Sequence, residues 1–78
     1  MPRYYFDVYN DDVTLDEEGA EFADGYAARD HAIKEARVLA ADSVLRGHLI
    51  ANHHIEIVDS NRISLGTVRF GEAVDIRS

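Results

Sequence analysis

Residues 24–46, DGYAARDHAIKEARVLAADSVLR, have the pattern of one long amphipathic helix. Asp24 suits the N-cap because its carboxylate can accept hydrogen bonds from the free N–H groups of the first turn. Gly47 suits the end of the helix because glycine enters the left-handed region at little cost. Small and apolar residues recur at helical spacing on one face, which we expect to lie on a sheet. That face comprises Ala28, Ala32, Ala36, Leu39, Ala40 and Ser43, with Ile33 and Val44 at its edge.

One pair of strand-like segments precedes this helix in the sequence, and a second pair follows it. Residues 3–16 begin with RYYFDVY, where alternation places Tyr4, Phe6 and Val8 toward the core. Residues 54–70 alternate in the same way through Ile55 and Ile57. In the second half of this segment, Ile63 and Leu65 are expected to point inward. The alternation then shifts by one residue, so that Val68 and Phe70 become the apolar positions. Gly66 is the natural place for a β-bulge that accommodates this change.

The resulting order is ββαββ. It predicts an α+β fold, in which an antiparallel sheet carries one long helix packed on one face. Residues 71–76 are expected to add a last helical turn. A chain of 78 residues indicates one small domain, residues 1–78. Such a short chain buries only about 60% of its unfolded surface, so a second copy or a partner would add useful buried area.

The composition and charge of the chain argue against some classes of function. The net charge is −7, and acidic residues dominate up to Asp24, where Arg3 is the only base. This distribution argues against direct nucleic-acid binding, which needs a basic surface, and favours a basic partner. The chain has no cysteine, no signal-peptide pattern and no apolar run long enough to span a membrane. We therefore expect a cytoplasmic protein without membrane contact.

Candidate chemical sites are sparse. An EF-hand reading of Asp12, Thr14 and Asp16 fails because Glu17 and Ala23 stand where glycine and glutamate are required. The adjacent His53 and His54 would point to opposite faces of a strand, so neither zinc nor any other cofactor is predicted. No hydrolytic or phosphate-binding motif is present, and no residue is assigned as catalytic.

Two surfaces remain as binding candidates. The sheet face opposite the helix is expected to carry Tyr5, Asp7, His54 and Glu56, which is the best ligand-like or enzyme-like group in the chain. Val38, Ala41 and Leu45 recur on the helix side opposite the core face. They suggest an interface for self-association, although scattered exposed apolar residues or cover by the C-terminal tail would also explain them.

The opening MPRYYFDVY resembles a family of small bacterial proteins classed as a domain of unknown function, as do the segment DEEGAE at 16–21 and the residues Asp24, Ala27–Arg29, Ala32 and Ala36. This resemblance covers nearly the whole chain and implies a sheet-plus-helix domain, without an activity or site residues. More remotely, the hairpin, Gly19 and the helix that opens at Asp24 resemble the N-terminal domain of HicB-type antitoxins. That family binds and masks a small RNA-cleaving toxin.

The sequence therefore favours a non-enzymatic protein–protein interaction module that self-associates, with a homodimer as the candidate assembly. One alternative is an antitoxin-like neutraliser of a small basic RNA-cleaving toxin. The other is a small-ligand-binding or enzymatic domain that uses the open sheet face.

Overall fold

A computed structural model describes residues 2–50 and 52–74 of the chain. Within these ranges the backbone forms five strands and two helices. In chain order they are β1 (Arg3–Tyr9), β2 (Val13–Thr14), β3 (Ala20–Glu21), α1 (Gly25–Leu45), β4 (His54–Val58), β5 (Ser64–Arg69) and α2 (Phe70–Ala73).

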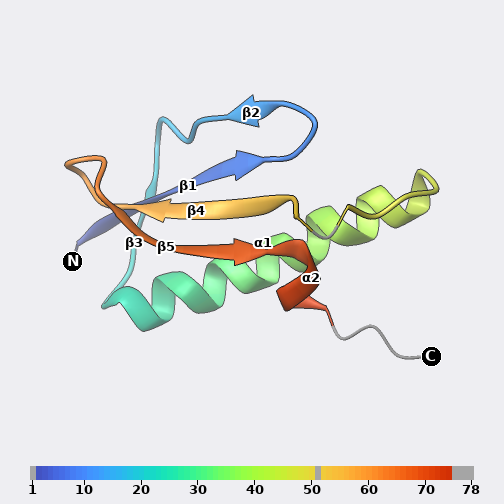
Figure 1. Cartoon of the computed structure of the whole chain (residues 1–78). Coiled ribbons are helices and arrows are strands. Elements are labelled where there is room, and N and C mark those ends of the chain that lie inside the picture. Colours follow the sequence, from blue (N-terminus) through green and yellow to red (C-terminus); the bar gives the residue numbers. More distant parts are fainter. Residues whose placement is uncertain (1, 51, 75–78) are drawn as a thin grey trace.

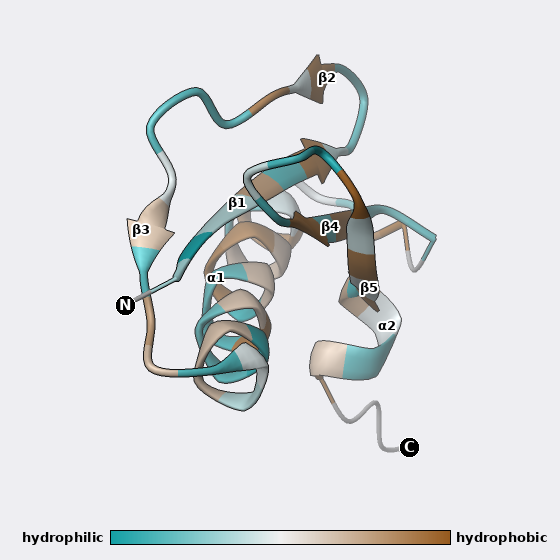
Figure 2. Ribbon diagram, turned by 90° about the vertical axis from the view of Figure 1, so that its left-hand side faces the viewer, coloured by the Kyte–Doolittle hydropathy of each residue, from teal (hydrophilic) through white to brown (hydrophobic). Residues whose placement is uncertain are grey.

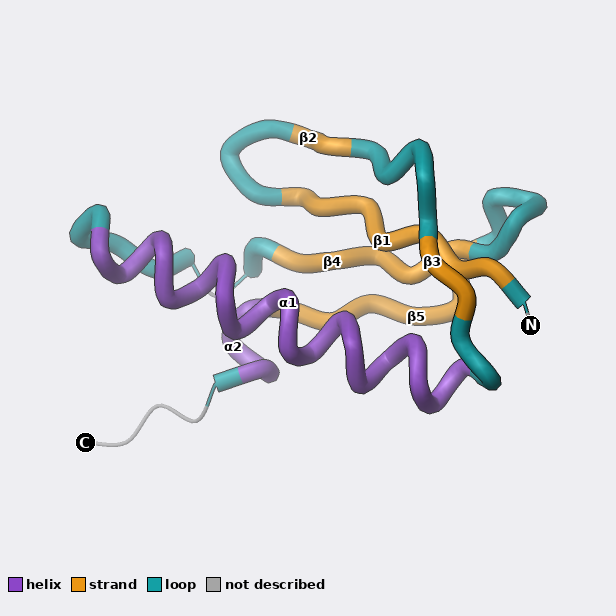
Figure 3. The backbone as a smooth tube through the Cα atoms, turned by 180° about the vertical axis from the view of Figure 1, so that it is seen from behind, coloured by secondary structure: helices purple, strands orange, loops and turns teal. Residues whose placement is uncertain are grey.

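The strands form one antiparallel sheet in the order β2-β1-β4-β5, and α1 crosses one of its faces (Figures 1 and 3). The outer edge of β1 is shared by two short strands. Near the end of β1, β2 pairs Thr14 with Val8, and near its start β3 pairs Ala20 with Tyr4. The predicted α+β architecture is confirmed, with β3 as an additional short strand.

The ends of α1 lie where the sequence predicts them. The Asp24 carboxylate accepts a hydrogen bond from the Ala27 N–H at 2.9 Å, which satisfies one of the free donors of the first turn. Gly47 follows the helix with a φ of 98°, a value that residues with a side chain rarely adopt.

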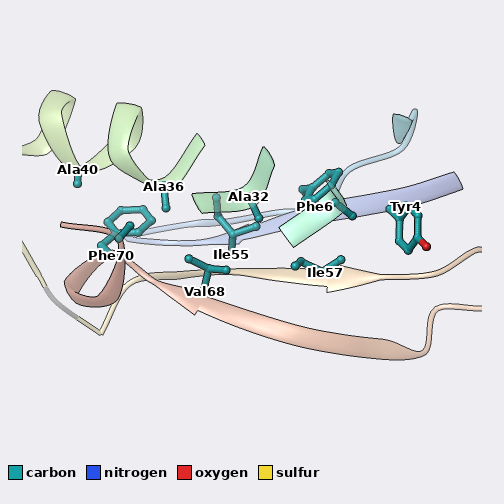
Figure 4. Close-up of a cluster of buried hydrophobic side chains, with 11 residues drawn as sticks. Tyr4, Phe6, Ala32, Ala36, Ala40, Ile55, Ile57, Val68 and Phe70 are labelled. Atoms are coloured by element: carbon teal, nitrogen blue, oxygen red, sulfur yellow. The ribbon is translucent and has the colours of Figure 1, made fainter. Parts of the chain in front are cut away.

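Alanines form the contact between α1 and the sheet. Ala28, Ala32, Ala36 and Ala40 are all buried. Figure 4 shows the short side chains of the last three facing larger residues of the sheet and α2. Because a methyl group fills little space, the helix backbone lies close to the strands and the bulk of the core comes from the sheet. The sheet and α2 supply Tyr4, Phe6, Ile55, Ile57, Val68, Phe70 and Ala73. Leu39 and Ile33 are half-buried at the margin.

The predicted bulge is confirmed, but its consequences differ from the expectation. β4 and β5 shift register between Ile57, which opposes Gly66, and Val58, which opposes Ser64, so Leu65 is the extra residue. Val68 and Phe70 are buried as predicted. The inward placement of Ile63 and Leu65 is wrong. Both side chains are exposed, because Ile63 belongs to the β4–β5 turn and Leu65 to the bulge.

Two other expectations need correction. Val44, expected at the edge of the core face, is exposed, and Ser43 is only half-buried, because the last turns of α1 extend past the ends of β4 and β5 (Figure 1). The final helical turn begins at Phe70 and ends at Ala73, and residues 75 and 76 of the expected turn lie outside the described residues. Neither helix among residues 2–50 and 52–74 has the length and apolar character needed to cross a bilayer.

The alanine contact predicts a specific sensitivity to larger side chains. Ala36→Leu should lower the free energy of unfolding by about 1–3 kcal/mol, because three additional carbons have no space between α1 and the sheet. The matched control Ala23→Leu, at an exposed position just before α1, should change stability by less than about 0.5 kcal/mol. Urea unfolding followed by circular dichroism measures both. Equal effects of the two substitutions would contradict the packing described here.

Candidate functional site

The sheet face opposite α1 brings the predicted group together. In the register of β1 and β4, Tyr9 opposes His54, Asp7 opposes Glu56 and Tyr5 opposes Val58. Alternation along each strand then places Tyr5, Asp7, His54 and Glu56 on one face, as expected. This placement makes the face a candidate site, and its chemistry depends on how each group is bonded.

Asp7 is already engaged by two neighbours. Its side chain is buried, with only 1% of the residue exposed, in the face opposite α1. One carboxylate oxygen forms an ion pair with Arg62, and the other accepts a hydrogen bond from the Asp16 N–H at 2.9 Å. Both oxygens of a buried carboxylate are thus compensated, as a buried charge requires. Asp7 is therefore a structural carboxylate, positioned to join β1 to two loops.

Arg62 reaches Asp7 from a tight turn between β4 and β5. Its φ of 63° lies in the left-handed region, which is uncommon for a residue with a side chain. Asp59 holds this turn, because its carboxylate accepts from the N–H groups of Asn61 and Ile63 at 2.9 and 3.0 Å. The ion pair and the capped turn together keep the guanidinium over the open face.

Asp16 lies in the connection between β2 and β3 and binds the edge of β1 between these two short strands. Its carboxylate accepts hydrogen bonds from the backbone N–H groups of Phe6 at 3.1 Å, Glu18 at 3.2 Å and Gly19 at 3.1 Å. Burial alone would raise the pKa of this carboxyl. The three donated hydrogen bonds and the positive charge of Arg62 outweigh that effect and hold the pKa of Asp16 below its ordinary value of 3.8.

Gly19 lets the same loop lie directly on β1. It has a φ of 67°, and a Cβ atom at this position would stand 2.8 Å from the Tyr4 carbonyl oxygen and 2.9 Å from the Tyr5 ring. Backbone atoms cannot move away cheaply, so the position requires glycine. The loop from Asp16 to Gly19 consequently covers part of Tyr5, one of the four predicted face residues.

The histidines are also occupied by neighbouring side chains. His54 stacks on Tyr9, with ring centroids 4.8 Å apart and an angle of 8° between the planes. His53 lies edge-on to Phe70 at 5.9 Å, and His31 forms a pair with Glu35 at 3.4 Å. Across residues 2–50 and 52–74, no three His, Asp or Glu side chains come together as a metal ion would require. On the open face, Glu56 and the His54 edge lie beside Thr67 and Arg69 of β5, which oppose them in the register.

The second candidate surface lies on the protruding end of α1. Val38 is 68% exposed, Val44 56% and Leu45 86%. Beside them is a hollow of about 460 Å³ with mainly aliphatic walls. We name the group Val38, Ala41, Val44, Leu45 and Leu49 the outer helix surface. Sequence reasoning identified Val38, Ala41 and Leu45. It missed Leu49 and Val74, which line the hollow from outside the helix and so have no helical spacing to reveal them.

A comparison with protein families identifies the family of this chain. Residues 3–71 match the family model of a domain of unknown function, DUF6894, and the chain belongs to that family. No curated protein and no solved structure matches the chain. The resemblance to a domain of unknown function is thus confirmed, whereas the comparisons give no support for the HicB-type relationship.

The lowered pKa of Asp16 predicts a pH-dependent contribution to stability. A carboxyl with a depressed folded pKa stabilises the fold fully above its unfolded pKa of about 3.9, and the contribution is lost as the pH falls through the folded value. Asp16→Asn should therefore be less stable than the wild type at pH 7, and the difference should shrink below about pH 4. Urea unfolding between neutral and acidic pH measures this. The exposed Asp12→Asn serves as the control and should show little difference at either end. A gap between wild type and Asp16→Asn that stayed constant with pH would refute the assignment.

Proposed function

We propose that this chain is a non-enzymatic protein–protein interaction module that forms a homodimer through the outer helix surface. The observation that carries the proposal is the exposure of Val38, Val44 and Leu45 along the C-terminal half of α1. The last turns of this helix extend beyond the sheet (Figure 1). Leu49 and Val74 pack beside the last turns, but Val44 and Leu45 stay exposed among the described residues. Covering such a patch with a partner is the usual way to remove it from water.

The geometry of α1 fits a two-fold arrangement. In an antiparallel pair of α1 helices centred near Ala41, Val38 of one copy would lie against Leu45 of the other, and the small Ala41 would permit close approach. Lys34 and Asp42 would lie at the rim, where opposite charges add specificity. Each Å² of apolar surface removed from water contributes about 25 cal/mol, a useful gain for a chain of this size.

The state of the open sheet face supports a non-enzymatic role. A general acid or base must be free to exchange a proton with a bound molecule. Asp7 is instead buried beneath Arg62, and His54 is stacked on Tyr9. The small-ligand or enzymatic alternative that uses Tyr5, Asp7, His54 and Glu56 consequently has less support than the interaction module.

The antitoxin-like alternative needs an acidic docking surface for a small basic partner. The concentration of acidic residues up to Asp24 agrees with that need. A cytoplasmic location forms part of the same proposal, since a chain without cysteine is compatible with a reducing compartment.

The dimer predicts a clear response to charge on α1. The double variant Val38→Glu with Leu45→Glu should remain folded by circular dichroism and become monomeric by analytical ultracentrifugation, because four carboxylates would meet in one contact. The matched control is Ile63→Glu with Leu65→Glu, which places the same charges on two exposed aliphatic positions near β5. The control should remain dimeric. A wild-type chain that stays monomeric at high concentration would overturn the proposal.

A second expectation concerns nucleic acids. With a net charge of −7, the chain should show no submicromolar binding to RNA or DNA, because phosphate contacts require clustered Lys and Arg. A gel-shift series at low and moderate salt tests this. Tight binding that weakens steeply with salt would mean that the scattered arginines form a basic surface in the assembled protein.

A further inference from the structure

The sheet is wider than the single helix that covers it. α1 lies beneath the strands, and the connection from β2 to β3 arches away from it (Figure 2). Between this connection and the helix is a hollow of about 500 Å³. Phe6, Val8 and Leu15 are among its apolar lining residues, and Glu17, Glu18 and Glu35 are among its acidic ones. We name this the β1–β2 hollow.

The apolar part of the hollow is an uncovered continuation of the core. Phe6 is buried, and its ring meets the His31 ring edge-on with centroids 4.9 Å apart. Val8 is only partly buried, and Leu15 is exposed. A protein with a second helix on this face would fill the space from within its own chain. Among the described residues, nothing further covers it.

Acidic residues predominate in the lining of the hollow. Asp16 also contributes to its lining, and no lysine or arginine among the described residues does so. Two arginines lie nearby. The charge of Arg62 acts on Asp16, and Arg3 donates a hydrogen bond to the Glu18 carbonyl at 2.8 Å and pairs with Glu21. His31 lies 3.4 Å from Glu35 and holds that carboxylate beside the opening. Clustered like charges beside low-dielectric walls strengthen the local negative potential.

We propose that the β1–β2 hollow binds an arginine-bearing, partly apolar segment of a basic partner protein. The aliphatic stem of an arginine would lie along Phe6, Val8 and Leu15, and its guanidinium would reach the carboxylates of Glu18 and Glu35. Arginine suits this combination because it has a long apolar stem and a planar head that pairs with carboxylates. The inference rests on the proposed role as an interaction module. It specifies the chemistry of a second partner and uses a surface separate from the outer helix surface.

A pair of labelled peptides tests this binding. The probes are a fluorescein-labelled octapeptide of alternating leucine and arginine, and an octapeptide of equal charge in which serine replaces leucine. Fluorescence anisotropy should give tighter binding for the leucine peptide. Glu18→Gln with Glu35→Gln should weaken that binding about tenfold, the loss expected for about 1.4 kcal/mol of charge-assisted contact.

The matched control is Asp11→Asn with Asp12→Asn, which removes the same charge from the β1–β2 turn, outside the hollow. It should weaken binding less than twofold. Equal losses in both double variants, equal affinity for the two peptides, or no binding by the wild type would each overturn the proposal. The same measurement on Val38→Glu with Leu45→Glu separates peptide binding in the β1–β2 hollow from dimerisation through the outer helix surface. Peptide binding that persists in this monomer supports the hollow whether or not the chain dimerises.

Discussion

The buried carboxylate of Asp7 is the interaction on which the open side of the sheet depends. It joins the middle of β1 to the Asp16 N–H in the β2–β3 connection and to Arg62 in the β4–β5 turn. A charge this deeply buried is tolerated only when its partners are in place, so both loops must close for the sheet to be stable. Asp16 then extends the same network to the edge of β1 through three backbone N–H groups.

This network gives structural roles to the residues that most resemble an active site. Two carboxylates, a histidine and two tyrosines share one sheet face, but Asp7 serves the fold and His54 is held against Tyr9. Function is better sought where the fold leaves apolar surface uncovered. One long helix on a wider sheet creates two such places: the outer helix surface, where α1 extends past the strands, and the β1–β2 hollow, which α1 leaves uncovered. The first is aliphatic and suits a second copy, whereas the second is acidic and suits a basic partner.

Local signals in the sequence were sufficient for much of this fold. Asp24 and Gly47 mark the ends of α1, the alanine spacing predicts its buried face, and the change of parity at Gly66 predicts the bulge. Ile63 and Leu65 were expected to be buried because alternation alone does not show which residues a turn or a bulge leaves exposed. The pairing of Asp7 with Arg62 spans 55 positions and depends on a left-handed turn, so no local pattern reveals it. The hollow depends on the width of the sheet relative to the helix, which is a property of tertiary structure alone.

A double-mutant cycle on Asp7 and Arg62 tests most directly whether Asp7 is a structural carboxylate. Asp7→Asn keeps an acceptor for the Asp16 N–H while removing the charge, and Arg62→Gln removes the partner charge. Arg62→Gln should cost more stability in urea unfolding than Asp7→Asn, because it leaves a buried carboxylate unpaired. The coupling free energy should be about 1–3 kcal/mol, within the range found for residues in one ion-pair network. Effects that add to within about 0.5 kcal/mol would show that the pair is not coupled, and would return Asp7 to the list of groups available for chemistry.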